Sequence, residues 1–256
     1  MYHIYMAIQL TFSSSQSNQS PNAIDFTSKI TPPIELGSDT KYEMALVNMT
    51  VPNTWFNISA ELGNNVIRYN NGSVWRANIV IPDGQYSVDS LNNLLQAQML
   101  LNGDYVTSDP VSYDITIYGD NNTLKVVVQI ANGYQLDLSL SSIYKLLGFD
   151  SGIISTTTMA PHAADLSNGI TSFILHSDLI TSTYINGGAG DILYVFNFSV
   201  GAGFFQTFEP NQLIFIPIRS QSLLELMRFY ITDQLNRYVN FNGEDMTVTV
   251  YIRPIK

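Results

Sequence analysis

The segment NFNGEDMTVTVYIRPIK, residues 240–256, combines a turn with one long alternating strand. Asn242-Gly243 favours a tight hairpin turn, because both residues tolerate a positive φ. From Met246 to Pro254 polar and apolar residues alternate, which is the period of a half-buried strand. The segment therefore predicts a hairpin turn and a strand that lies inside a sheet, beside the first segments of the chain.

Similar strand-like segments occur towards both ends of the 256-residue chain. They are separated by polar turns, and Asn-Gly occurs six times, which favours an antiparallel β protein rich in meanders. Residues 31–39, with two prolines, are predicted as a turn segment. The predicted strands are residues 3–12, 23–30, 42–52, 170–180, 191–200, 204–210, 211–218, 225–234 and 246–254.

The middle of the chain has a different pattern. After a strand and a turn, Leu91, Leu94, Leu95 and Met99 share one face of a helix that Ser87 or Asp89 can cap. Two strands, a short helix and a polar return linker follow.

Two β segments that flank an insert are most simply one interrupted β domain, because the first strands alone cannot bury both faces. The predicted fold class is mainly β, a single jelly roll or β-sandwich interrupted by a small α+β insertion domain. Residues 1–62 and 165–256 form the discontinuous jelly-roll domain, and residues 63–164 form the insertion domain with its return linker.

The composition narrows the classes of partner and compartment. Charged residues make up 12% of the chain, about half the usual level, and such surfaces often face other protein. The net charge is −10 and the 11 basic residues are scattered, so direct nucleic-acid binding is not expected. There is no cysteine, no signal-peptide pattern and no run long enough to span a membrane. A reducing cytosol or nucleus is the expected place of synthesis.

No sequence motif indicates a catalytic or metal-binding site. His3, His162 and His176 lack metal-type spacing, and no G-x-S-x-G segment occurs. Glu209 and the Glu244-Asp245 pair are the carboxylates considered for a cleft, but they adjoin a strand end and a turn. We predict no catalytic residue, no metal site and no cofactor, and hence a protein that is not an enzyme.

The segment TDQLNRYVNFNGED, residues 232–245, is the densest in turn-forming and charged residues. Arg237 lies within reach of Asp233, Glu244 or Asp245. One interpretation is a local ion pair in a turn, which contributes little by itself. The other is a stiff loop at a protein interface.

Four segments, residues 42–58, 81–95, 142–150 and 226–254, resemble the penton-type (vertex) minor capsid proteins of Polinton/Maverick-like viruses and virophages. In the same order, their sequences are YEMALVNMTVPNTWFNI, IPDGQYSVDSLNNLL, SIYKLLGFD and LMRFYITDQLNRYVNFNGEDMTVTVYIRP. The chain departs from the family pattern at Asn236, where glycine is familiar, and at Tyr42, where tryptophan is common.

The resemblance implies a structural virion protein, a homopentameric vertex subunit that closes the fivefold positions of an icosahedral capsid. Its partners would be itself, the major capsid protein of the same virus and, through the insertion domain, a host receptor or glycan. It would be made in the host cytosol or nucleus and reside at the capsid vertex. The alternative is a lectin-like or receptor-binding jelly-roll module; a glycoside hydrolase is the least favoured class. The predicted structural or interface residues are Trp55, Asp233, Arg237, Asn242, Gly243 and Glu244.

Overall fold

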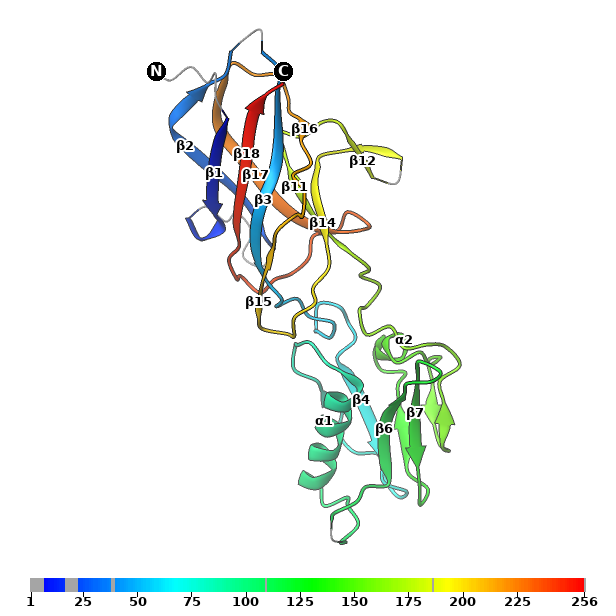
Figure 1. The fold of residues 1–256 in the computed structure, drawn as a ribbon. Helices are drawn as coiled ribbons and strands as arrows, with labels where there is room; N and C mark the ends of the chain where they lie inside the picture. The colour runs from blue at the N-terminus through cyan, green and yellow to red at the C-terminus, as the bar shows by residue number, and fades with distance from the viewer. Residues whose placement is uncertain (1–6, 17–22, 38–39, 109, 186, 256) are drawn as a thin grey trace. The chain divides into compact units, whose positions relative to one another are not determined.

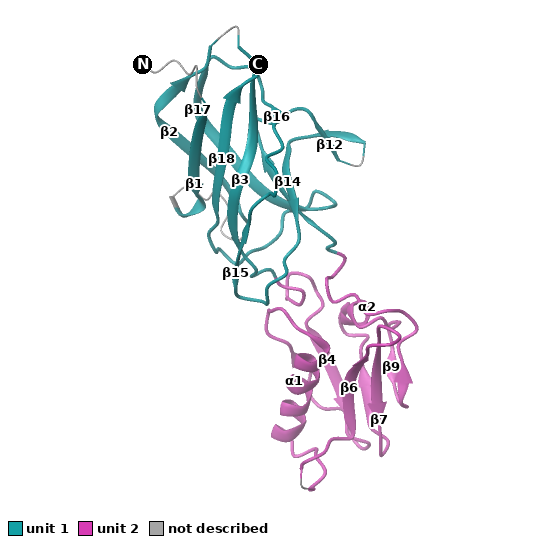
Figure 2. Cartoon of the chain, viewed as in Figure 1, with its two compact units in different colours: residues 1–55, 170–256 teal, residues 56–169 magenta. Residues whose placement is uncertain are grey.

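The structure, a computed structural model, describes residues 7–16, 23–37, 40–108, 110–185 and 187–255. The chain forms two compact units, shown in Figure 2. Unit 1 comprises Met1–Trp55 and Ile170–Lys256, and unit 2 comprises Phe56–Gly169. Among the described residues, no helix is long and apolar enough to cross a membrane.

The unit boundaries differ from the predicted ones, which lie after residues 62 and 164. The reason is local hydrogen bonding by Asn57, which is almost completely buried. Its side-chain amide donates to the carbonyls of Tyr86 and Leu166, both at 2.8 Å, and so fastens the two ends of the insert together. Unit 2 therefore begins several residues before the first apolar strand that marks the insert in the sequence.

Unit 1 is a jelly roll of two antiparallel sheets (Figure 1). In the described part of the chain one sheet has the order β1-β18-β3-β15, with β16 also paired to β3, and the other has the order β14-β11-β17-β2. Between successive strands the chain crosses from one sheet to the other, except from β11 to β14 and from β15 to β16, as two Greek keys require. The predicted fold class is thus confirmed. The strands are β1 Ile8–Ser13, β2 Asp25–Glu35, β3 Tyr42–Pro52, β11 Phe173–Ser177, β14 Ile192–Phe196, β15 Phe205–Phe208, β16 Ile216–Pro217, β17 Leu223–Asp233 and β18 Thr247–Pro254.

Strand β18 lies inside its sheet, as the alternating segment predicts. It pairs with β1 on one side (Ile8 opposite Ile252) and with β3 on the other (Tyr42 opposite Pro254). The preceding turn, however, is not a hairpin. It carries the chain from β17 in one sheet to β18 in the other, because the ladder partners of β17 are β2 and β11.

Strand β2 continues through the two prolines that the sequence assigns to a turn. It reaches Glu35 and pairs Ile34 with Leu224 of β17. Proline is tolerated here because β2 is the edge strand of its sheet, where a missing N–H removes no ladder bond on the outer side.

Two smaller elements of unit 1 complete the fold. A 3₁₀ turn, η1 Ser14–Gln16, follows β1, and a hairpin of β12 Thr183–Ile185 and β13 Gly188–Gly190 precedes β14. The sequence analysis did not predict this hairpin. Residues 3–6 of the first predicted strand lie outside the described residues.

Unit 2 has its own hydrophobic core. Ser87 caps α1: its hydroxyl accepts from the backbone N–H of Ser90, one of the two caps predicted. The buried face of α1 includes Leu91, Leu95 and Met99, as predicted, whereas Leu94 is only partly buried. The elements are β4 Val66–Asn70, β5 Ile79–Val80, α1 Val88–Leu101, β6 Ile115–Asp120, β7 Lys125–Ile130, β8 Gln135–Asp137, α2 Ile143–Leu146, β9 Ile153–Ile154 and β10 Thr158–Met159.

Candidate assembly surface

The turn after β17 is organised by the carboxylate of Asp233, whose side chain is 3% exposed. One oxygen accepts the backbone N–H groups of Leu235 (2.8 Å) and Arg237 (2.9 Å). The other accepts the guanidinium of Arg237 at 2.7 Å. Asn236 has φ +63°, so it occupies the left-handed conformation that glycine takes most easily. The described contacts of Arg237 thus favour the local ion pair.

The next turn lies between β17 and β18 and is hydrogen-bonded to the segment that follows β3. Asn242 and Gly243 both have positive φ, as the Asn-Gly pair predicts. The amide of Asn242 donates to the carbonyl of Thr54, and the hydroxyl of Thr54 donates to the carbonyl of Phe241 at 2.7 Å. The backbone N–H of Glu244 closes the turn on Phe241, while its side chain is exposed.

Trp55 belongs to an aromatic cluster in the core of unit 1 and is 9% exposed. Its ring lies 5.8 Å from that of Phe173, which also contacts Phe198 and Phe241. Because Phe241 accepts the Thr54 hydroxyl, the structure brings Trp55 and the Asn242 turn together. Asp233 and Arg237 form a separate turn. Of the six predicted residues, Arg237, Asn242, Gly243 and Glu244 belong to the exposed class, whereas Trp55 and Asp233 are buried.

One of the openings on unit 1 is an apolar pocket that the sequence did not indicate. It has a volume of ≈510 Å³. Figure 1 places β12, β14 and β16 on one side of the unit, and their residues surround it. The pocket is lined by Leu46 of β3, Thr183 and Tyr184 of β12, residues 192–195, and Pro210, Ile214 and Ile216 on the path into β16.

The pocket coincides with an interruption in the edge strand. On this side of β3, Met49 pairs with Phe208 of β15, and Met44 pairs with Ile216 of β16. In the described structure residues 45–48 of β3 have no strand partner there. The chain between β15 and β16 leaves the sheet, and this departure opens the pocket.

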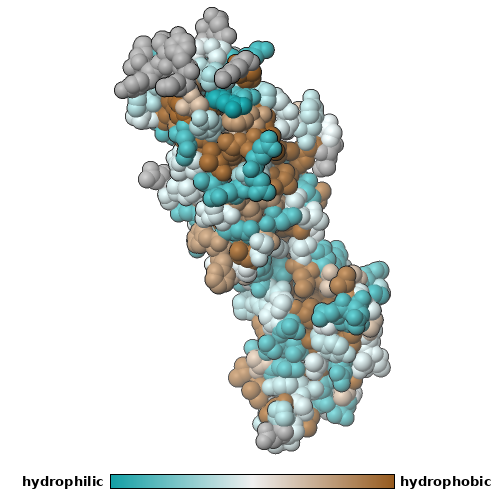
Figure 3. All heavy atoms as spheres, in the orientation of Figure 1, coloured by the Kyte–Doolittle hydropathy of each residue, from teal (hydrophilic) through white to brown (hydrophobic). Residues whose placement is uncertain are grey.

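Large apolar side chains are exposed at two places on unit 1, and Figure 3 shows hydrophobic residues at its surface. Ile214 is 71% exposed and Tyr184 is 73% exposed, both at the pocket. Phe204 and Phe205, at the start of β15, are 67% and 57% exposed. Exposed aromatic and aliphatic side chains of this kind are typical of protein interaction sites.

A buried polar cluster on β11 and β17 is a second feature that the sequence did not indicate. His176 is 1% exposed; its Nδ1 lies 2.7 Å from a carboxylate oxygen of Asp191, and its Nε2 lies 2.8 Å from the hydroxyl oxygen of Thr232. The ring stacks on Tyr230 at 4.5 Å, and Tyr230 donates to the other oxygen of Asp191. These contacts have the order of an acid–base–hydroxyl triad.

The cluster nevertheless lacks the access that a nucleophile requires. Thr232 is 1% exposed, and its hydroxyl also donates to the carbonyl of Asp233. Burial lowers the pKa of His176 despite the opposing effect of Asp191, so the ring is held neutral. We read the cluster as a structural link between the sheet strands.

The neutral His176 predicts an acid-labile unit 1. The unfolded chain takes up a proton near pH 6.5, whereas folded His176 takes it up only at lower pH. The contribution of neutral His176 to the free energy of unfolding is therefore fully present above pH 6.5. Below pH 6.5 the free energy of unfolding falls, with a slope approaching about 1.4 kcal/mol per pH unit.

Urea titrations at several pH values measure the slope. His176→Gln should reduce it, whereas His162→Gln, at a site 69% exposed, should not. Asp178 has a raised pKa and acts with the opposite sign at lower pH, so the variants must be compared at each pH.

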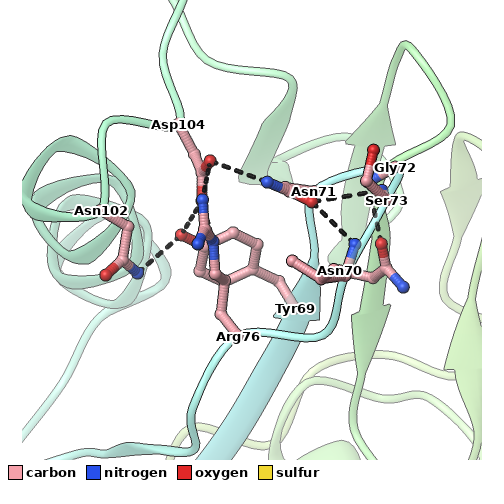
Figure 4. A network of polar contacts seen from close by, with 9 residues as sticks. Tyr69, Asn70, Asn71, Gly72, Ser73, Arg76, Asn102 and Asp104 are labelled. Carbon is pink, nitrogen blue, oxygen red and sulfur yellow. Dashed lines mark hydrogen bonds and ion pairs between the residues drawn. The ribbon is translucent and has the colours of Figure 1, made fainter.

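Unit 2 contains a polar network around Asp104 (Figure 4). Its carboxylate accepts the guanidinium of Arg76 at 2.5 and 2.6 Å, the hydroxyl of Tyr69 at 2.7 Å and the amide of Asn71 at 3.0 Å. These donors, led by Arg76, lower the pKa of Asp104 to about 2. Burial above all raises the pKa of Tyr69 to about 12. The network joins the end of α1 to β4, since Asn102 also donates to the Tyr69 hydroxyl.

Metal-binding geometry is not found in the residues that the structure describes: they contain no cluster of three or more His, Asp or Glu side chains that could hold an ion. The features that stand out are instead the apolar pocket, the exposed phenylalanines and two internally satisfied polar clusters. This inventory suits a surface that binds protein.

Comparison with known proteins gives structural neighbours only. No family model matches the chain, and no curated protein matches it. The crystal structure of the mavirus penton protein matches over 98% of this chain and 100% of its own, with a TM-score of 0.49 and 9% identity. The chain is similar in its course to that penton protein. A chain of the Sputnik virophage matches over 96% of this chain and 97% of its own, with a TM-score of 0.42 and 12% identity.

These likenesses lie in the course of the chain. At 9% and 12% identity they assign no role to any residue. The topology of unit 1 is established by its own strand pairing.

Proposed function

We propose that this protein is a structural component of a virion, and that five copies form the subunit ring at the fivefold vertex of an icosahedral capsid. Jelly rolls are a recurrent fold of capsid proteins, although the fold alone does not decide function. The penton-like sequence segments support the vertex role, and the low charge of the surface suits contact with other protein. The shape of the subunit would close the vertex, and no catalysis or cofactor would be needed.

The observation that carries the proposal is the set of exposed apolar side chains of unit 1, at the pocket and just before β15. A ring needs heterologous contacts, in which one surface of a copy meets a different surface of the next. Exposed Tyr184, Phe204 and Ile214 supply the aromatic and aliphatic anchors that such contacts use. The major capsid protein of the same virus would contact the outside of the ring.

The native mass of the full chain tests the proposal. We expect a species of five copies at high protein concentration, and fivefold rings in negative-stain images of the same sample. A monomer at every concentration, both alone and mixed with the major capsid protein, would contradict the vertex role.

The exposed part of the C-terminal turn is the second surface that we assign to assembly. Arg237 keeps its side chain 59% exposed while it pairs with Asp233, and Glu244, in the next turn along the chain, is also exposed. Arg237→Glu is expected to weaken ring formation, because it places an acid against a neighbour in an already acidic chain. Native mass measures the loss of rings, and urea unfolding of the variant shows whether the fold is also weakened. If the variant forms rings as stable as those of the wild type, Arg237 has no interface role and only its ion pair with Asp233 remains.

A receptor-binding role for unit 2 is the second candidate function. The observation that favours it is a row of exposed apolar residues around the end of α1: Leu100, Leu101, Tyr105, Val106 and Val111. Leu101, at 78% exposed, is the most exposed of them. We expect the full chain to bind host-cell surface protein or glycan and Leu101→Ser to weaken that binding. Equal binding by the wild-type chain and the Leu101→Ser variant would contradict this receptor-binding role.

A further inference from the structure

The apolar pocket of unit 1 is large enough to receive an aromatic side chain. A cavity of about 150 Å³ lined by aliphatic residues already binds a benzene ring. The pocket here measures ≈510 Å³ and is lined chiefly by apolar residues, among them Leu46, Ile214 and Ile216. An opening of this size in contact with water leaves apolar surface that an occupant would cover.

Phe204 is the outstanding apolar projection of unit 1. Among the large hydrophobic residues described there, only Tyr184 and Ile214 are more exposed, and both already line the pocket. Phe204 lies outside the pocket lining and is 67% exposed.

The backbone around Phe204 is held in place. The N–H of Asn53 donates to the carbonyl of Phe204 at 2.8 Å, and the N–H of Gly203 donates to the carbonyl of Asn53 at 2.8 Å. The amide of Asn53, itself 4% exposed, donates to the carbonyl of Val200 at 2.8 Å. An anchor with a fixed backbone loses little conformational entropy when it binds.

Phe204 cannot fill the pocket of its own molecule. Its carbonyl is fixed opposite Asn53, at the end of β3, whereas the pocket is built around Leu46 of the same strand. Seven residues of extended chain separate these positions, which is about 20 Å at the rise of a strand. A fixed loop does not cross that distance.

We propose that Phe204 of one copy of the chain inserts into the apolar pocket, formed around Leu46, Ile214 and Ile216, of another copy. This inference rests on the self-assembly in the proposed function and names its contact. The side chain and the pocket share one chemistry and occur on every copy, so each copy gives one phenylalanine and receives one.

Cysteine cross-linking tests the contact, because the chain has no cysteine of its own. We would introduce Ala202→Cys and Gln212→Cys into one chain, at exposed sites two residues from Phe204 and Ile214, so that both anchors stay in place, and treat the assembled protein with a short bismaleimide. A covalent ladder that ends at five copies is expected. A chain carrying Ala202→Cys with Val80→Cys, a site 65% exposed on unit 2, is the matched control and should give no ladder.

The outcomes separate this inference from the proposed function. Rings of five by native mass without a 202–212 cross-link would overturn the contact and leave the vertex role standing. Cross-linking that stops at two copies would support the contact and overturn the ring. A protein that neither assembles nor cross-links at any concentration would overturn both.

Side-chain removal gives an independent measure. Phe204→Ser should weaken self-association at least about 30-fold, the loss typical of an aromatic anchor. Ile214→Arg, at a site 71% exposed, should weaken it similarly by placing a charge at the mouth of the pocket. Val80→Ser, at a site 65% exposed on unit 2, should leave self-association unchanged. Unchanged association in the Phe204 variant would overturn the contact.

Discussion

Replacing Phe173 with alanine is expected to lower the unfolding free energy of unit 1 by about 4 kcal/mol, because a buried aromatic ring is lost and a cavity remains. Phe173 is 5% exposed. Its ring centroid lies 5.1–6.1 Å from those of Trp55, Phe196, Phe198 and Phe241. These rings come from β11, from β14 and its continuation, and from the segments beside β3 and β18, so both sheets lose a shared contact.

The two tryptophans allow this effect to be assigned to one unit. Trp55 lies in unit 1 and Trp75 in unit 2, so a Trp75→Phe background leaves fluorescence that reports unit 1. Urea titration in that background measures the loss. Leu235→Ala, at a site 59% exposed in the same unit, should change stability by less than about 0.5 kcal/mol. A Phe173 variant as stable as this control would show that the cluster tolerates a cavity.

Much of the fold follows from patterns that are local in the sequence. The apolar run Tyr42–Pro52 predicts β3 to the residue, and the 3.6-residue spacing of Leu91, Leu95 and Met99 predicts α1 and its buried face. The jelly roll follows from a further argument, that strands before and after an insert must share a core. The ladder between β3 and β18 meets this requirement.

The errors arise where the destination of a turn depends on distant strands. Asn242-Gly243 takes the positive φ values that its residue types predict, but the chain crosses between sheets there instead of forming a hairpin. Local chemistry fixes the bend, and the pairing of β17 with β2 fixes where the chain goes next. The prolines of β2 mislead for the same reason, because their tolerance depends on an edge position that is set by the whole sheet.

The candidate site was predictable only in part. Asp233 and Arg237 are four residues apart, so their ion pair can be read from the sequence. The pocket cannot, because Leu46 and Ile214 are brought together by the gap between two short edge strands. His176 and Thr232 likewise meet only through the register of β11 against β17.

Asp104→Asn is expected to have the second largest effect, a loss of about 3 kcal/mol in the stability of unit 2, as charge-assisted hydrogen bonds become ordinary or are lost. Asp104 is 6% exposed and accepts from fully buried Tyr69 at 2.7 Å. The asparagine amide would place N–H donors against donors that now meet a carboxylate. Urea titration in a Trp55→Phe background, where Trp75 reports unit 2, measures the loss.

The pH dependence of unfolding distinguishes the contribution of the Asp104 charge to stability from the contribution of its packing. Its folded pKa of about 2 lies below the ordinary value of 3.8, so its contribution is present above pH 3.8 and is lost as the pH falls towards 2. Wild-type and Asp104→Asn chains should therefore converge in stability as the solution becomes acidic. Asp150→Asn, at a site 85% exposed in the same unit, should follow the wild type throughout. If the difference between wild type and Asp104→Asn stayed constant down to pH 2, packing rather than charge would hold this network together.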